Sequence, residues 1–162
     1  MSLVPSEPPK RDHGEELHHA PRHSVRGLRE TIMVKLGYAT VGSNKLEEAK
    51  KFYDALFSPE GVAPAFEHPS GGRVYGKDGN LFFGVLGPYD KKPATIGNGS
   101  MVALNFDNRA QVDAFHARAL SLGGADEGAP GERGPNFYFS YFRDLDGNKI
   151  AVFFSARQKK PA

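Results

Sequence analysis

The side chains best suited to acid–base chemistry in the body of the chain are His68 and His116, the two histidines beyond residue 30. An imidazole titrates near neutral pH and can act as a general base. His116 stands beside the apolar stripe of a predicted helix and is expected to face solvent. His68 ends a predicted strand before Pro69 and is the better candidate. No Ser-His-Asp or paired-carboxylate pattern accompanies either residue.

The composition excludes several other chemistries. The absence of cysteine rules out disulfides, thiolate metal sites and cysteine nucleophiles. The net charge is only +2, and no element of the body carries a basic stripe, so nucleic acid is not an expected partner. No apolar run is long enough to span a bilayer and no secretory signal is visible, so no membrane partner is expected and the chain is placed in the cytoplasm.

A second group of candidates lies near the end of the body. Arg133, on a glycine-rich loop, could hold an anionic group at the mouth of a site, or it could be a solvated surface arginine. Tyr138 and Tyr141 alternate with phenylalanines, so one tyrosine is expected to face a concavity and the other to pack beneath a helix. Asp144–Lys149 is predicted to be a strand-to-strand turn, in which the aspartates satisfy backbone amides and Gly147 allows a positive φ.

The elements that would position these residues occur twice. A strand over 32–41 leads to a helix whose start, Asn44 with Glu47, is typical of a capping box. Strands over 62–68, 73–77 and 81–86 follow. After a loop, the order repeats as a strand over 100–106, a helix, a glycine-rich connection, and a hairpin of 137–142 and 150–154. The apolar stripe of the second helix (Val112, Phe115, Ala119, Leu122) lies 66 residues beyond that of the first.

This repeat predicts an α+β domain of two βαβββ modules. The domain is expected over 31–157, with module one at about 31–87 and module two at about 99–156. Residues 1–30 combine four histidines with few apolar residues and are expected to be a disordered or partly vector-derived tail. Residues 158–162 are a short C-terminal tail.

Three segments together resemble the vicinal oxygen chelate superfamily, which includes glyoxalase I, bleomycin resistance proteins and extradiol dioxygenases. They are Asn44–Tyr53 (NKLEEAKKFY), Ala119–Gly124 (ALSLGG) and Tyr141–Lys149 (YFRDLDGNK). The resemblance covers residues 32–155. It implies the glyoxalase/bleomycin resistance/dioxygenase fold, with a cleft between curved mixed sheets.

The resemblance also implies where metal-dependent members carry their ligands. These positions fall on Tyr38, Phe83, Met101 and Ala151, and none of these side chains suits a hard divalent ion. No metal and no other cofactor is therefore expected. Tyr38, Phe83 and Met101 could instead line an apolar ligand pocket, with the Tyr38 hydroxyl as an orienting group, or they could simply fill the core.

The sequence thus predicts a protein that binds a small organic ligand in an aromatic cleft without a divalent metal. The expected ligand-binding residues are Tyr38, Phe83, Met101, Arg133, Tyr138, Tyr141 and Ala151. One alternative is a lyase or isomerase of the lactoylglutathione lyase type, with Tyr38 or His68 as the proton shuttle. Another is a structural or partner-binding module. A homodimer is expected because members of this superfamily often pair and the modules leave sheet edges.

Overall fold

The computed structural model describes residues 35–156. The predicted tails at 1–30 and 158–162 lie outside the described residues, as does the start of the predicted first strand. Within residues 35–156, no helix is long and apolar enough to cross a membrane.

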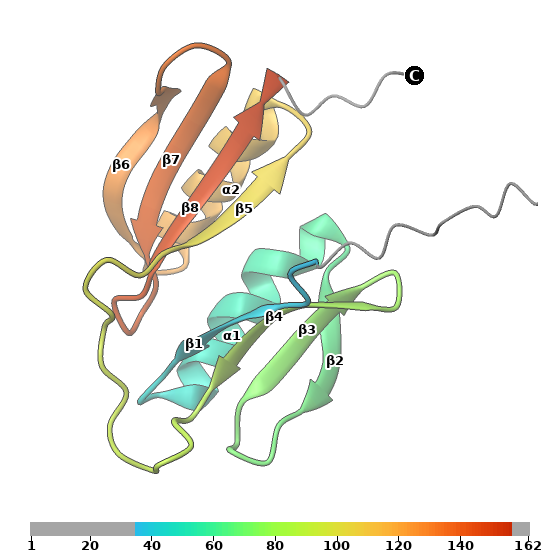
Figure 1. Cartoon of the computed structure of the whole chain (residues 1–162), viewed down its shortest axis with the longest axis vertical. Helices are drawn as coiled ribbons and strands as arrows, with labels where there is room; N and C mark the ends of the chain where they lie inside the picture. The colour runs from blue at the N-terminus through green and yellow to red at the C-terminus, as the bar shows by residue number, and fades with distance from the viewer. Residues whose placement is uncertain (1–34, 157–162) are drawn as a thin grey trace, which may run out of the picture. The chain divides into compact units, whose positions relative to one another are not determined.

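Module one forms a four-stranded sheet with a helix on one face (Figure 1). Its elements are β1 (Ala39–Gly42), α1 (Leu46–Phe57), a 3-10 turn η1 (Ser58–Glu60), β2 (Ala63–Glu67), β3 (Arg73–Lys77) and β4 (Asn80–Leu86). The strand order is β1-β4-β3-β2. β1 runs parallel to β4, and the other neighbours are antiparallel.

Module two repeats this arrangement (Figure 1). Its elements are β5 (Val102–Phe106), α2 (Arg109–Ser121), β6 (Ala125–Glu132), β7 (Phe137–Arg143) and β8 (Lys149–Ser155). The strand order is β5-β8-β7-β6, again with a single parallel pair, β5 with β8. The predicted α+β fold of two βαβββ modules is confirmed.

The apolar stripes of the two helices lie in one continuous core, as their spacing predicts. Tyr53 and Leu56 of α1 are buried, as are Val112 and Phe115 of α2. The rings of Phe57 and Phe115 lie 6.1 Å apart, between centroids, and so join the two modules.

Two sequence-based boundaries are wrong. The first strand covers only Ala39–Gly42, and residues 35–38 are not in a strand. The glycine-rich connection after α2 is in fact the edge strand β6, whose pairing with β7 shifts register near Gly128 and Gly131. Glycine weakens a strand, yet it allows the bulges that let this segment pair at a sheet edge.

The expected capping box at α1 does not form. The N-cap is Lys45, and it makes no side-chain capping bond. The Asn44 side chain instead bonds the linker between the modules: its Nδ2 donates to the carbonyl of Ala94 at 2.9 Å, and its Oδ1 accepts from the Ala94 amide at 2.7 Å. By contrast, Asn108 does cap α2 by accepting from the amide of Gln111 at 3.0 Å.

The turn at Asp144–Lys149 is present, and it also holds the modules together. Asp144 accepts from the backbone amides of Asp146 and Asn148 at 3.0 and 2.8 Å, and Gly147 has a φ of 90°. The Asn148 side chain donates to the carbonyl of Gly42 at 2.9 Å. The turn therefore contacts β1 of the other module as well as closing its own hairpin.

His116 is buried, with 2% of its surface exposed, so the expectation that it faces solvent is wrong. β6 widens the second sheet on that side of α2, and Asp126 of β6 lies 3.3 Å from His116 Nε2. Burial lowers the pKa of His116, while the nearby Asp126 and Asp113 oppose that effect.

Candidate functional site

The face of the second sheet that points away from α2 is rich in aromatic rings. Phe142, Ile150 and Val152 point toward α2 in the core, so alternation directs their neighbours along each strand to the other side. We call this side the aromatic face, and it is formed by Phe137, Phe139, Tyr141 and Phe153.

The rings of the aromatic face form a continuous row. Phe139 stacks on Phe153 at 4.8 Å and on Tyr141 at 5.8 Å, both between ring centroids. Phe137 lies 6.1 Å from Phe139. β6 leaves room for the row, because a Cβ on Gly128 would lie 2.9 Å from Cδ2 of Tyr141. The row offers a flat apolar surface for a planar molecule.

Two cations stand at the Tyr141 end of the row. Arg143 and Lys149 are a cross-strand pair on β7 and β8. The Lys149 ammonium lies 5.1 Å from the Tyr141 ring centroid. Glu127 contacts both cations, Arg143 Nη2 at 2.6 Å and Lys149 Nζ at 3.6 Å. Two positive charges against one carboxylate leave an excess positive charge beside the rings.

Two adjoining pockets open at this basic end. One, of about 290 Å³, lies between the end of β1, including Thr40, and the start of β5. The other, of about 600 Å³, is bordered by Arg143 and the linker. They share Met101 and Lys149, with Ile96, Gly97 and Ser100 of the linker. The basic end of the aromatic row therefore has space for a small molecule.

Of the predicted residues, the structure places Tyr141 and Met101 at this end. Ala151 pairs with Tyr141 across β7 and β8 and belongs to the same face, but its side chain is fully buried and offers no surface to a ligand. Met101 lines both pockets and is 46% exposed. Tyr38, which directly precedes β1, is 48% exposed and lines neither pocket, although Thr40 two residues later lines one of them.

Phe83 does not join this group. Its side chain is fully buried, and its ring lies 4.7 Å from that of Tyr53 and 5.5 Å from that of Phe57, between centroids. The repeat in the sequence predicts Phe83 as the counterpart of Ala151. An offset that is wrong by one residue selects the opposite face of the strand, because neighbouring residues of a strand point to opposite faces. In module one Gly84, which pairs with Thr40, occupies the face away from α1.

Arg133 and Tyr138 are also placed elsewhere. The Arg133 guanidinium bonds its own segment, donating to the carbonyls of Glu132 at 3.0 Å and Ala129 at 3.1 Å. Tyr138 points to the α2 side, where its hydroxyl donates to Asp113 at 2.8 Å. Of the two tyrosines on β7, Tyr141 is therefore the one on the aromatic face.

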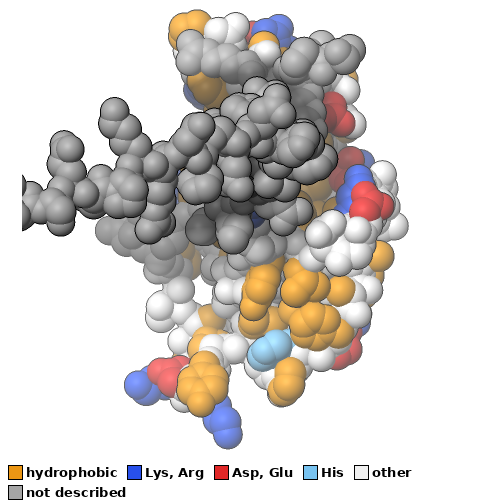
Figure 2. All heavy atoms as spheres, turned by 45° about the vertical axis from the view of Figure 1, so that its right-hand side comes forward, with side chains coloured by type: hydrophobic (Ala, Val, Ile, Leu, Met, Phe, Trp, Pro, Cys, Tyr) orange, Lys and Arg blue, Asp and Glu red, His pale blue; other side chains and the backbone are white. Residues whose placement is uncertain are grey.

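His68 lies at a third place, at one end of the first sheet. Its Nδ1 accepts from the amide of Ser70 at 3.2 Å. It lines a wide hollow of about 1150 Å³ with the end of β1 and the linker residues around Tyr89. Figure 2 shows hydrophobic side chains gathered around a histidine on the face in view, with basic and acidic side chains at the margins of this group. Neither Tyr38 nor Met101 borders this hollow.

The side chains at the expected ligand positions do not fit a divalent ion. Phe83 is packed beneath α1, and Met101 and Ala151 offer no oxygen or nitrogen donor. Among residues 35–156, no three His, Cys, Asp or Glu side chains are grouped so that they could hold a metal.

The sequence reasoning missed the residues that give this site its charge. In the sequence, Lys149 and Arg143 stand out only as parts of the turn motif. The available signal was alternation: Phe137, Phe139, Tyr141 and Arg143 are spaced two residues apart, so they share one face of a strand.

Comparison with known proteins agrees with the fold and the order of its elements. Residues 35–152 match the family model of the Glyoxalase/Bleomycin resistance protein/Dioxygenase superfamily. The chain belongs to this superfamily. Among curated proteins, no match was found.

Several solved structures resemble the chain over most of its length. A glyoxalase/bleomycin resistance protein from Albidiferax ferrireducens T118 is 39% identical to the chain. The match covers 74% of this chain and 97% of that protein, with a TM-score of 0.67. A lactoylglutathione lyase from Agrobacterium tumefaciens is 19% identical, over 78% of this chain and 98% of its own, with a TM-score of 0.59. A glyoxalase/bleomycin resistance protein/dioxygenase family enzyme from Burkholderia phytofirmans PsJN is 16% identical. The match covers 75% of this chain and 99% of that enzyme, with a TM-score of 0.60. The two more distant structures show the fold alone.

Proposed function

We propose that this protein binds a small organic anion with a flat apolar body on the aromatic face, and that it does so without a divalent metal. The observation that carries the proposal is the row of stacked rings that ends at Lys149 and Arg143. The flat part of the ligand lies on Phe139 and Tyr141, and its acidic group reaches the two cations. Met101 supplies an adaptable wall, since its unbranched side chain adopts many shapes.

The charge of the site supports an acid over a neutral or basic ligand. Glu127 balances only one of the two cations, and all three side chains are partly shielded from water, with 29 to 33% exposure. Partial burial strengthens a charged contact relative to a fully exposed one. Arg143 also donates from Nη1 to the carbonyl of Gly147 at 2.7 Å, which holds its guanidinium at this end of the row.

Isothermal titration calorimetry with two matched probes tests this proposal. Naphthalene-2-carboxylate and its neutral amide have the same flat body and differ in charge. The carboxylate is expected to bind about tenfold more tightly, the size of one charge-assisted hydrogen bond. Lys149→Met should remove that preference, whereas Lys45→Met, on the exposed start of α1, should keep it. Equal affinity of the two probes for the wild-type protein would overturn the proposal.

The metal-free part of the proposal has its own test. Elemental analysis of tag-free protein is expected to find no stoichiometric divalent ion. A bound ion, or a glyoxalase activity that a chelator abolishes, would instead favour chemistry of the lactoylglutathione lyase type.

We also propose that a second copy of the chain covers part of this region. Tyr38 and Met101 each expose nearly half of their surface, and the edge strands β1 and β5 each have one paired neighbour in the described part of the chain. Light scattering after size-exclusion chromatography should give twice the mass of the chain. A monomer at micromolar concentration would refute this.

A further inference from the structure

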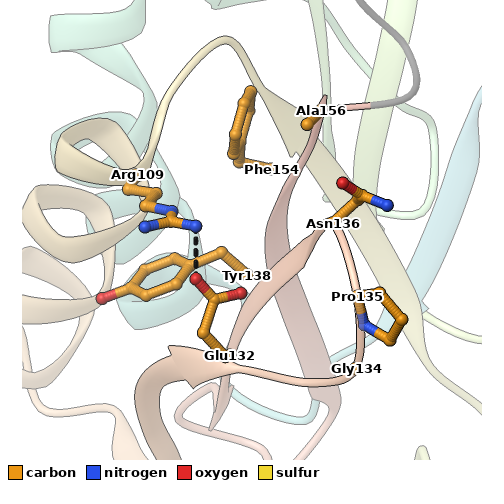
Figure 3. A pocket seen from close by; sticks show the side chains of 8 residues that line it. All are labelled: Arg109, Glu132, Gly134, Pro135, Asn136, Tyr138, Phe154 and Ala156. Carbon is orange, nitrogen blue, oxygen red and sulfur yellow. Dashed lines mark ion pairs between the residues drawn. The ribbon is translucent and has the colours of Figure 1, made fainter.

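A separate pocket lies on the α2 side of the second sheet, across β7 and β8 from the aromatic face (Figure 3). Its volume is about 420 Å³, within the range of small-molecule sites. Its lining includes Arg109 at the start of α2, Glu132 at the end of β6, Asn136 of the next loop, Tyr138 of β7, and Phe154 and Ala156. We call it the α2 pocket. It shares no lining residue with the pockets at Met101.

Opposite charges meet in the α2 pocket. Arg109 Nη2 forms an ion pair with Glu132 Oε1 (Figure 3). The pair is solvated, because 58% of the Arg109 side chain and 52% of that of Glu132 are exposed. This contact involves one of the guanidinium nitrogens and one carboxylate oxygen, whereas a guanidinium carries five N–H donors and a carboxylate two acceptor oxygens. Both groups therefore keep capacity for a ligand without breaking their own contact.

Tyr138 holds the arginine in place. The Arg109 guanidinium lies 5.4 Å from the Tyr138 ring centroid, a cation–π distance. The Tyr138 hydroxyl is in turn fixed by Asp113, and this hydrogen bond raises the pKa of Tyr138. The phenol stays neutral at physiological pH, so Arg109 and Glu132 are the charged groups that line the pocket.

The remaining walls are apolar or rigid. Phe154, partly buried from β8, and Ala156 offer apolar surface. Asn136 has a φ of 69°, which is uncommon for a residue other than glycine. Its carbonyl accepts from the Ala156 amide at 3.1 Å, and the Arg133 amide bonds the Phe137 carbonyl at 2.9 Å. The loop is therefore held in one shape before a ligand arrives.

We propose that the α2 pocket binds a zwitterionic α-amino acid with an apolar side chain. Its carboxylate contacts Arg109, its ammonium contacts Glu132, and its side chain packs on Phe154. A ligand with only one charge would meet a like charge in the adjacent group, whereas a zwitterion matches both. This inference uses residues separate from those of the proposed function and does not depend on it.

Titration of the full chain with three related probes tests the inference. L-Phenylalanine carries both charges, N-acetyl-L-phenylalanine only the negative one, and L-phenylalaninamide only the positive one. Phenylalanine is expected to bind in the millimolar range or tighter, and each derivative about tenfold more weakly, because each lacks one charged contact. Amide NMR shifts should concentrate at residues 132–138 and at the start of α2.

Two substitutions test the α2 pocket further. Glu132→Gln should lower the affinity for phenylalanine about tenfold and raise that for N-acetylphenylalanine, since the ammonium contact and the like charge beside the carboxylate are both lost. Lys45→Met, on the exposed start of α1, is the control and should leave phenylalanine binding unchanged. Equal affinities for the three probes, no binding at millimolar concentration, or shifts confined to the aromatic face would each overturn the inference. The comparison of probes needs only wild-type protein, so it stands even if a variant fails to fold.

Discussion

The hydroxyl of Tyr53 on α1 donates a 2.7 Å hydrogen bond to Oδ2 of Asp144, at the start of the turn in the other module. Both groups are buried. Burial and the neighbouring carboxylate of Asp144 raise the pKa of Tyr53, so the phenol remains a donor throughout the physiological range. One bond thus links the helix of one half to the turn of the other.

Tyr53→Phe is expected to destabilise the protein by about 1.5–3 kcal/mol, because a buried carboxylate loses a charge-assisted bond. Urea unfolding followed by circular dichroism measures the change. The matched control is Tyr138→Phe, whose hydroxyl bonds Asp113 at an exposed position and should cost about 0.5 kcal/mol or less. Similar losses in the two variants would show that the link to Asp144 has no special role.

Gly147→Ala is expected to cost more stability than Gly79→Ala, although the two glycines occupy corresponding turns of the repeat. Both have positive φ, 90° and 76°, so both substitutions introduce backbone strain. Only at Gly147 would the new Cβ meet a neighbour, Cδ1 of Ile96 at 2.6 Å, since nothing lies within 4 Å at Gly79. The excess should be about 0.5 kcal/mol in denaturant unfolding, because Cδ1 ends the half-exposed side chain of Ile96, which can turn aside at the cost of a less favoured rotamer. Adding Ile96→Ala should remove the excess, and an excess that persists would contradict the predicted contact.

Asn44→Ala is expected to loosen the linker between the modules, because both bonds to Ala94 are lost. The measurement is the rate of tryptic cleavage after Lys91, an exposed linker residue. Asn44→Ala should raise this rate severalfold. Asn108→Ala removes the cap of α2, costing about 1 kcal/mol, and serves as a control for general destabilisation. Equal increases in the two variants would mean that the Asn44 bonds do not hold the linker.

Acidification is expected to destabilise the wild-type protein partly through His116. Because burial lowers its folded-state pKa, the unfolded chain binds the proton more readily. The contribution of neutral His116 to the free energy of unfolding is therefore complete above the pKa of about 6.5 that a histidine has in the unfolded chain. This contribution is lost as the pH falls below that value. Urea midpoints at pH 7.5 and 5.5 should differ less in His116→Leu than in wild type. The other histidines are present in both proteins, so an identical difference would exclude His116.

Much of the fold could be predicted from local pattern. The stripes of Tyr53 and Phe115 have helical period, and the turn at Gly147 has the residues that a positive φ requires. The strand β6 could not be recognised, because its glycines and proline are typical of a loop. Its pairing is set by its neighbour β7. The burial of His116 could not be predicted for the same reason, since Asp126 of that strand lies against its ring.

The candidate site was harder to predict, because a register error of one residue reverses the face of a strand. The repeat predicts Phe83 as the counterpart of Ala151. Phe83 is buried beneath α1, whereas Ala151 does lie beside Tyr141. The ion pair of Arg109 with Glu132 joins residues from α2 and β6 that no motif connects. Such a contact depends on tertiary packing, and no periodic pattern in the sequence predicts it.

The pleat of β7 and β8 has a consequence for how this protein can diverge. Phe153 and Phe154 are adjacent in the chain, yet the first belongs to the aromatic face and the second to the α2 pocket. Mutations at the odd-numbered positions of β7 (137–143) and β8 (149–153) can therefore alter one surface while the even-numbered residues of the two strands preserve the other. Two selective pressures can act on the same short stretch of gene, each on every second codon.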